Sequence, residues 1–228
     1  MEIDILASGS SGNCYRVSDG KTSLLLDCGI PIRRIERGLN FQLHMIEAVL
    51  VTHCHQDHVK AAKDIAKRGI PIYTSAGTLN ACKFAGYQYR PVQPLEAVQI
   101  GTFTVIPFDV EHDAPEPLGF ALKSSVTKEK LLYFTDTYYL KYRFPGIHYL
   151  MAECNYSLKT MSEEINPALR DRIIESHMSL ETLLELLKAN EFRELKQVHL
   201  LHLSSDNSDE ELFKTAVQKA TGVEVYVC

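Results

Sequence analysis

The sequence lacks several features that would point to common functional classes. No apolar run approaches the roughly 18 residues that a membrane-spanning helix needs, so we expect no membrane segment. The first four residues, MEID, carry two acids and no basic stretch, which argues against an export signal and predicts a cytoplasmic protein. The six cysteines form no Cys-x-x-Cys pair, so we expect reduced thiols rather than disulfides.

A chain-wide positive charge is also absent. The 228 residues carry a net charge of −5, so any contact with nucleic acid has to be made by a local patch. Repeats, long linkers and low-complexity stretches are missing as well. With 45% hydrophobic and 23% charged residues, the composition is that of a globular chain. We therefore predict a single domain over residues 1–228.

Short apolar segments alternate with helical patterns along the chain. Leucines three and four residues apart after Ser179 predict one helix, and residues 208–222 predict another with Ser208 as its cap and Gly222 at its end. A third helical pattern runs from His58 to Arg68. Predicted strands include Ile3–Ala7, Ser23–Leu26, Ile46–Val51, Phe103–Phe108, Leu131–Phe134, Tyr149–Ala152 and Val198–Leu203. This mixture favours two packed sheets with helices outside them.

The strongest functional signal is segment 52–58, which reads THCHQDH and begins where a predicted strand ends. His53 and His55 point to the same side while the chain stays extended. The turn into the next helix can bring Asp57 and His58 back to the same place. Three imidazoles and one carboxylate are more ligands than one Zn²⁺ needs. The segment therefore predicts a site for two metal ions.

Further ligands have to come from other strand ends. His112, Asp136 and His202 each lie where a predicted strand ends, which is a usual place for functional side chains. Taken singly, a histidine there is more typical of packing, and an aspartate is more typical of a turn. Their combination with segment 52–58 makes them candidate ligands.

Together these residues resemble the metal signature of the metallo-β-lactamase superfamily, which is His-x-His-x-Asp-His followed by a distant His, Asp and His. The resemblance implies an α/β fold, the αβ/βα sandwich of two mixed sheets with helices outside. Segment 24–29, LLLDCG, resembles the early Asp-x-Gly motif of the superfamily, which implies that Asp27 orients the site. By the same resemblance, one metal is held by His53, His55 and His112, and the other by Asp57, His58 and His202, with Asp136 bridging them.

A narrower resemblance concerns segments 7–13 (ASGSSGN), 112–120 (HDAPEPLGF) and 202–204 (HLS). They are similar to the YycJ/WalJ-like branch, which is related to the tRNA 3′-processing and β-CASP ribonucleases. This branch implies that Glu153 and His177 assist the leaving group. Tyr156 stands near the place where branch members tend to have a histidine. That departure leaves leaving-group protonation and substrate choice open.

The resemblance implies a metal-dependent hydrolase, a phosphodiesterase or nuclease acting on DNA or RNA through a hydroxide between two metal ions, which Asp57 helps to hold. Zn²⁺ suits the histidines, and Mn²⁺ or Fe²⁺ fits a mixed histidine and carboxylate set nearly as well. Two alternatives stay open: a thioester or lactone hydrolase with the same centre, and a non-catalytic metal- or nucleic-acid-binding scaffold. Protein partners are not indicated.

Basic side chains near these motifs are candidates for phosphate binding, although a solvated helix surface is the more usual explanation of such charges. They are Arg33, Arg34, Arg37, Lys60, Lys63 and Lys67.

Overall fold

The structure is a computed structural model that describes residues 1–162, 165–190 and 192–228. The chain forms two compact units. Unit 1 comprises Met1–Asp109 and Ala114–Glu129, and unit 2 comprises Val110–Asp113 and Lys130–Cys228. The single domain expected over residues 1–228 stays a prediction. No helix among the described residues is long and apolar enough to cross a membrane.

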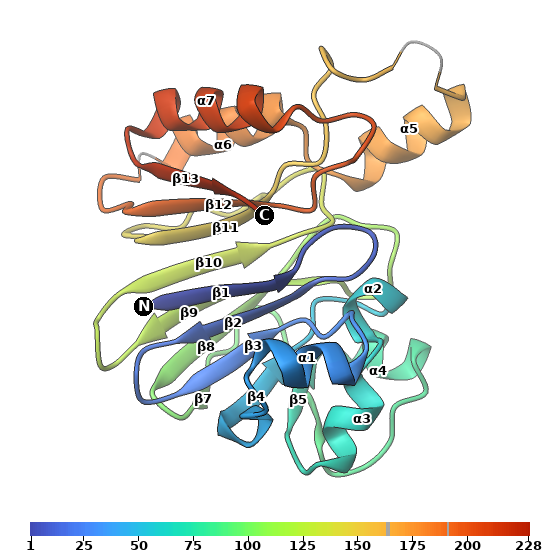
Figure 1. The fold of residues 1–228 in the computed structure, drawn as a ribbon, viewed down its shortest axis with the longest axis vertical. Coiled ribbons are helices and arrows are strands. Elements are labelled where there is room, and N and C mark those ends of the chain that lie inside the picture. The colour runs from blue at the N-terminus through green and yellow to red at the C-terminus, as the bar shows by residue number, and fades with distance from the viewer. Residues whose placement is uncertain (163–164, 191) are drawn as a thin grey trace. The chain divides into compact units, whose positions relative to one another are not determined.

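In unit 1, strands β1 to β6 form a mixed six-stranded sheet in chain order, and β7 to β9 form an antiparallel set (Figure 1). The pairs β1–β2 and β2–β3 are antiparallel, whereas β3 to β6 run parallel to one another. The bounds are β1 Glu2–Ala7, β2 Cys14–Ser18, β3 Ser23–Leu26, β4 Ile46–Leu50, β5 Ile72–Thr74, β6 Tyr89–Pro91, β7 Val98–Ile100, β8 Phe103–Asp109 and β9 Leu118–Ser124.

The helices of unit 1 are short. They are α1 Ile32–Gly38, the 3₁₀ turn η1 Leu43–Met45, α2 Gln56–Val59, α3 Ala62–Lys67 and α4 Ala76–Ala81. The helix predicted from His58 to Arg68 is thus two helices, interrupted at Lys60 and Ala61. The two predicted faces are confirmed, because Val59, Ala62 and Ala66 are buried, whereas Lys60, Lys63 and Lys67 are exposed.

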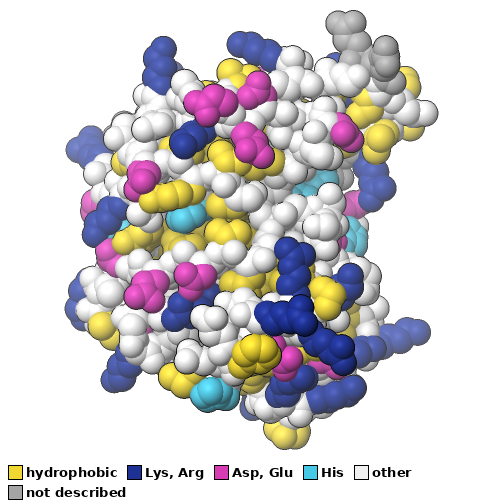
Figure 2. Space-filling model, in the orientation of Figure 1, with side chains coloured by type: hydrophobic (Ala, Val, Ile, Leu, Met, Phe, Trp, Pro, Cys, Tyr) yellow, Lys and Arg dark blue, Asp and Glu magenta, His cyan; other side chains and the backbone are white. Residues whose placement is uncertain are grey.

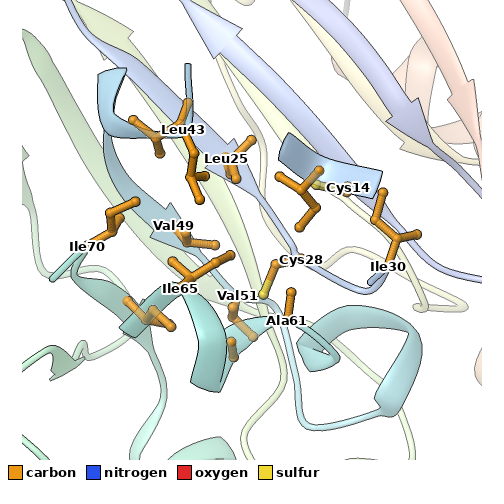
Figure 3. Close-up of a cluster of buried hydrophobic side chains, with 14 of the residues drawn as sticks. Cys14, Leu25, Cys28, Ile30, Leu43, Val49, Val51, Ala61, Ile65 and Ile70 are labelled. Atoms are coloured by element: carbon orange, nitrogen blue, oxygen red, sulfur yellow. The ribbon is translucent and has the colours of Figure 1, made fainter. Parts of the chain in front are cut away.

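The core of unit 1 packs helices against the sheet. Leu25 of β3 and Val49 of β4 belong to one buried cluster with Ile35 of α1 and Ile65 of α3 (Figure 3). Both neighbours of Leu25 in β3 are also fully buried, so this strand is covered on both faces and reads as a continuous apolar run. Each such side chain stabilises the fold by about 1.5–3 kcal/mol. The residues that follow β3 and β4 are therefore attached to strands that the core packing keeps in place.

In unit 2, four parallel strands lie in the order β13-β12-β11-β10. Helices α6 and α7 lie together on one side of these strands (Figure 1). Because the strands are parallel, the carboxyl ends of β10, β11 and β12 meet at one edge, where ligands usually bind. The bounds are β10 Lys130–Phe134, β11 Tyr149–Glu153, α5 Pro167–Ser176, α6 Leu180–Asn190, β12 Gln197–Leu201, α7 Glu210–Thr221 and β13 Glu224–Val227.

The helix ends of unit 2 confirm part of the sequence prediction. Ser179 caps α6, since its hydroxyl oxygen accepts a hydrogen bond from the Thr182 amide at 3.1 Å. Gly222 ends α7 in the left-handed conformation with φ 73°. The prediction that Ser208 caps α7 is wrong. Asp209 is the cap, since its side chain accepts from the Leu212 amide at 2.9 Å.

Candidate metal centre

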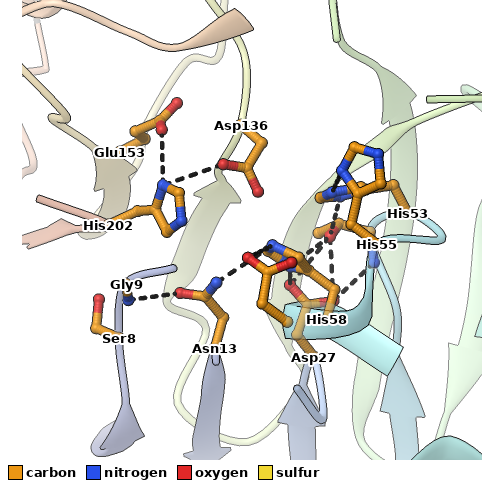
Figure 4. Close-up of polar contacts among 12 residues, drawn as sticks. Ser8, Gly9, Asn13, Asp27, His53, His55, His58, Asp136, Glu153 and His202 are labelled. Carbon is orange, nitrogen blue, oxygen red and sulfur yellow. Dashed lines mark hydrogen bonds and ion pairs between the residues drawn. The ribbon is translucent and has the colours of Figure 1, made fainter. Parts of the chain in front are cut away.

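Segment 52–58 follows β4 and gathers its four predicted ligands in unit 1, and Figure 4 shows His53, His55 and His58 close together. Nε2 of His53 lies 3.1 Å from Nδ1 of His55. The ring centroids of His53 and His58 are 4.1 Å apart. Nε2 of His58 lies 3.3 Å from a carboxylate oxygen of Asp57. The extended chain at His53 and His55 and the helical turn of α2 thus converge on one place, as the sequence predicts.

Asp27 is hydrogen-bonded to this cluster. It comes directly after β3, has a positive φ of 55°, and is fully buried. Its Oδ1 accepts from the Thr52 amide at 2.8 Å, and its Oδ2 accepts from Nδ1 of His58 at 2.8 Å. The Thr52 hydroxyl also donates to this carboxylate at 3.0 Å. That hydroxyl can then accept from Nδ1 of His53, which lies 3.0 Å away.

Asn13 is a member of this cluster to which the sequence assigned no role. Its Nδ2 lies 3.2 Å from Nε2 of His58. Its Oδ1 accepts from the Gly9 amide at 3.0 Å (Figure 4). It also accepts from the Tyr15 hydroxyl at 2.9 Å, and the two bonds fix the orientation of the amide. The signal that could have found it is segment 7–13, whose glycines and serines form the turn ahead of this residue.

The backbone of segment 27–29 is packed directly on the backbone of the metal motif. The Cys28 amide donates to the His58 carbonyl at 2.9 Å, and the Asn13 amide donates to the Asp57 carbonyl at 2.8 Å. A Cβ atom on Gly29 would lie 1.5 Å from the Asp57 carbonyl oxygen. Only glycine allows this approach, so the Asp-x-Gly motif has a steric reason.

Unit 2 gathers a second polar cluster at the carboxyl ends of its strands. One ligand atom from each of Asp136, Glu153, His177 and His202 lies within 4.8 Å of all the others. Oε1 of Glu153 accepts from Nδ1 of His177 at 2.6 Å. The same oxygen accepts from Nδ1 of His202 at 3.0 Å (Figure 4). Oδ1 of Asp136 lies 3.1 Å from Nδ1 of His202. Two predicted ligands, Asp136 and His202, therefore lie beside Glu153 and His177, the pair predicted to assist the leaving group.

Glu153 is completely buried and held by backbone as well as by histidines. Its second oxygen accepts from the Thr137 amide at 3.0 Å and from the Met178 amide at 3.1 Å. Burial opposes ionisation, but His177 beside it lowers the pKa of the Glu153 carboxyl. Burial in turn opposes protonation of His177, and Glu153 with Asp136 raises the pKa of His177 to about 10. The two side chains thus form an ion pair with His177 protonated at neutral pH.

His112 also belongs to unit 2 and lies beside this cluster. Its ring centroid is 6.0 Å from that of His177, and its Nδ1 donates to the Ser176 carbonyl at 3.3 Å. Burial lowers the pKa of His112, against the opposing effect of Asp136 and Asp113. The side chain therefore favours the neutral form that binds metals.

The arrangement of ring nitrogens fits a divalent metal ion. Four of the predicted histidine ligands have Nδ1 at hydrogen-bond distance from an oxygen. With the proton on Nδ1, the lone pair is on Nε2, which is the usual arrangement of metal-binding histidines. These histidines are His53 with Thr52, His58 with Asp27, His112 with the Ser176 carbonyl, and His202 with Glu153.

Three residues of the site have a left-handed backbone conformation, which six non-glycine residues outside the site share among the described residues. Asp27, Asp136 and His202 follow β3, β10 and β12, and each has a positive φ, of 55°, 48° and 53°. This conformation costs a non-glycine residue about 1–3 kcal/mol and is concentrated at functional sites. Tyr156, the departure noted in the sequence, is buried and pairs with Ser179 at the start of α6. Its place is therefore in the packing of unit 2.

Comparisons with known proteins bear on the family of the chain. The family model described as "Beta-lactamase superfamily domain" matches residues 22–202. The chain is 27% identical to exodeoxyribonuclease YycJ of Bacillus anthracis, over 96% of this chain and 88% of that protein. It is 29% identical to exodeoxyribonuclease WalJ of Streptococcus pneumoniae serotype 2, over 93% of this chain and 85% of that protein.

Solved structures bear on the fold. The structure of the metallo-β-lactamase fold protein YhfI from Bacillus subtilis has a TM-score of 0.77 at 17% sequence identity. The match covers 99% of this chain and 95% of that one. The predicted α/β fold class, with mixed sheets and outer helices, is thereby confirmed.

Proposed function

We propose that this chain, which belongs to the beta-lactamase superfamily, is a nuclease that hydrolyses phosphodiester bonds of DNA with two divalent metal ions. The enzyme class, a metal-dependent hydrolase, is confirmed by its relatives and its family. DNA is the proposed substrate because relatives that match more than nine-tenths of the chain are named exodeoxyribonucleases. The observation that carries the metal site is the set of histidines whose Nδ1 faces an oxygen.

The proposed ligands are those that the resemblance implies. When bound, the ions lower the pKa of a water molecule toward neutrality and stabilise charge on phosphoryl oxygens. Zn²⁺ is our first choice because histidines dominate the set, with Mn²⁺ or Fe²⁺ as alternatives. By the resemblance, His53, His55 and His112 would hold one ion, Asp57, His58 and His202 would hold the other, and Asp136 would serve both.

Glu153 and His177 are proposed to handle the leaving group. Glu153 holds Nδ1 of His177 at 2.6 Å, so the opposite ring nitrogen of the protonated ring can donate to the departing oxygen. Asp57 is half-buried beside His58 and is proposed to orient the attacking water through its carboxylate. Asp27 touches neither water nor substrate in this proposal, since it acts through His58.

A cytoplasmic location is part of the proposal. All six cysteines are free thiols, and Cys14, Cys28 and Cys154 are buried among other side chains. Burial raises the pKa of the Cys28 and Cys154 thiols, so these side chains behave as small apolar groups. Unoxidised thiols fit a reducing compartment.

The test is a nuclease assay on metal-reconstituted protein. We would supply Zn²⁺ or Mn²⁺ with single- and double-stranded DNA and RNA labelled at either end, beside His58→Ala. The matched control is His44→Ala, which removes an exposed histidine of η1. We expect stepwise release of end label from DNA, lost in His58→Ala and kept in His44→Ala.

Two results would overturn the proposal. One is protein that binds about two ions per chain and cleaves no nucleic acid, while it hydrolyses a thioester or a lactone. The other is full nuclease activity in His58→Ala, which would place the activity in a contaminant or at another site.

A further inference from the structure

A local basic surface lies on the helices that flank the metal motif of unit 1. We call it the α1/α3 surface and define it by Arg33, Arg34 and Arg37 of α1, together with Lys60, which ends α2, and Lys63 of α3. All five side chains are exposed. Figure 2 shows Lys and Arg side chains gathered over the part of unit 1 where Figure 1 draws these helices.

The charges of this surface are not neutralised locally. Two neighbouring basic residues are paired, since Arg68 lies 2.8 Å from Glu36 and Lys67 lies 3.9 Å from Asp64. Within the described ranges, none of the five residues of the α1/α3 surface forms an ion pair. Five uncompensated positive charges on a chain of net charge −5 form a distinct local field.

The surface is continuous with the proposed ligands of unit 1. Lys60 follows His58 by two residues at the end of α2. Segment 27–31 leads from Asp27 into α1, and Gly29 in that segment is packed on the Asp57 backbone. The arginines of α1 therefore lie only a few residues after Gly29, whose backbone is packed against the metal motif.

We propose that the α1/α3 surface binds the sugar-phosphate backbone of the substrate strand next to the nucleotide that is cleaved. This inference rests on the proposed function and specifies how that site takes a polymer. Arginine binds phosphate oxygens through paired N–H donors, and lysine binds them as a point charge. Such contacts carry no sequence information, so the surface selects a polyanionic strand rather than a particular base order.

The test separates strand binding from cleavage. We would compare the Arg33→Ala, Arg34→Ala, Arg37→Ala triple variant with a Lys188→Ala, Lys214→Ala, Lys219→Ala control, which removes three exposed charges from α6 and α7. Binding of a labelled single strand would be measured by anisotropy on metal-free protein over a series of NaCl concentrations. The plot of log K against log salt has a negative slope, and losing three phosphate contacts should make it less steep by about 2.

Cleavage supplies the second readout. We expect the arginine variant to lose at least about tenfold in kcat/KM on a long strand, as three phosphate contacts imply, and to keep wild-type turnover of bis(p-nitrophenyl) phosphate. The Lys60→Ala, Lys63→Ala variant should behave in the same way with a smaller change in slope. The lysine control should match wild type in both assays.

The outcomes are distinguishable. An unchanged slope and unchanged long-strand kinetics in both variants would overturn the inference and leave the proposed nuclease intact. Wild-type protein that binds no strand at all would overturn both. If the arginine variant lost binding to phosphatidylserine vesicles but kept DNA binding, the surface would serve a membrane, and the inference would be wrong.

Discussion

Oδ2 of Asp27 lies 2.8 Å from Nδ1 of His58, and both side chains are fully buried. Glu153 stands in the same relationship to His202, with 3.0 Å between Oε1 and Nδ1. In each case a carboxylate fixes the tautomer of a histidine that is proposed to bind metal through its other nitrogen. Glu153 therefore has a second task beside its contact with His177.

Replacing Asp27 by Asn should weaken metal binding about 10- to 100-fold. Both oxygens of Asp27 accept hydrogen bonds, from Thr52 and from His58, so an amide nitrogen at either position would face a donor. Titration against a competing chelator measures the effect. Asp206→Asn removes an exposed carboxylate and is the control. Equal metal affinity in both variants would contradict the positioning role of Asp27.

His177→Ala should lower kcat on DNA by about 10²- to 10⁴-fold and leave metal content unchanged. The reason is that His177 is proposed to protonate a poor leaving group, while it is absent from the proposed ligand set. A p-nitrophenolate leaving group needs no proton, so bis(p-nitrophenyl) phosphate should be cleaved nearly as fast as by wild type. Loss of bound metal, or equal losses on both substrates, would count against this assignment.

Glu153→Gln should differ from His177→Ala by affecting both metal and rate. Glu153 accepts from Nδ1 of His202 as well as from Nδ1 of His177, so its loss disturbs a proposed ligand and the proposed proton donor together. We expect weaker metal binding by chelator competition and slow turnover even of bis(p-nitrophenyl) phosphate. A variant that bound metal like wild type would reduce Glu153 to the leaving-group role alone.

The sequence predicted those parts of the site that are encoded locally. Segment 52–58 carries four candidate ligands within seven residues, and the predicted strands place His112, Asp136 and His202 at or just beyond strand ends. Asn13 and His58 are in contact although they are 45 residues apart in the sequence, and no short sequence pattern predicts such a contact. Oxygen partners of the ring nitrogens, such as the Ser176 carbonyl, depend on the same long-range packing.

Helix ends show where local rules compete. Both Ser208 and Asp209 are good cap residues, and the choice is made by the preceding loop, where the Ser208 hydroxyl donates to the Ser204 carbonyl instead. Helix α5 escaped prediction because its exposed residues form no apolar stripe. Asn166, which caps it, and Pro167 at its first turn were the available signal.

Gly29→Ala should destabilise the chain severely. The added Cβ would lie 1.5 Å from the Asp57 carbonyl oxygen, so either segment 27–29 or the metal motif has to move. We expect a loss at the upper end for single substitutions, about 4 kcal/mol or more, measured by urea unfolding. Gly38→Ala is the control, since its Cβ would meet only the Leu6 side chain at 3.0 Å. Wild-type stability in the Gly29 variant would contradict the close approach.

His199 should make the free energy of unfolding depend on pH. It lies in β12, 6% exposed, with its ring stacked on Tyr226 at 5.0 Å between centroids. Burial lowers the pKa of His199 to about 4, against a smaller opposing effect of Glu224. The unfolded chain, with a pKa near 6.5, then binds more protons than the native one between these values.

The stabilisation that the neutral His199 ring gives to the native state is therefore fully present above about pH 6.5. The free energy of unfolding then decreases as the pH falls toward 4, by about 3 kcal/mol in all. His199→Phe keeps a flat ring beside Tyr226 and removes the titration. The free energy of unfolding of metal-free protein, measured with urea, would be plotted against pH for wild type and variant. The two plots should run parallel above about pH 6.5, and the wild-type plot should fall more steeply below it. Parallel plots throughout would mean that the native pKa of His199 lies near its unfolded value, and would contradict the predicted effect of burial.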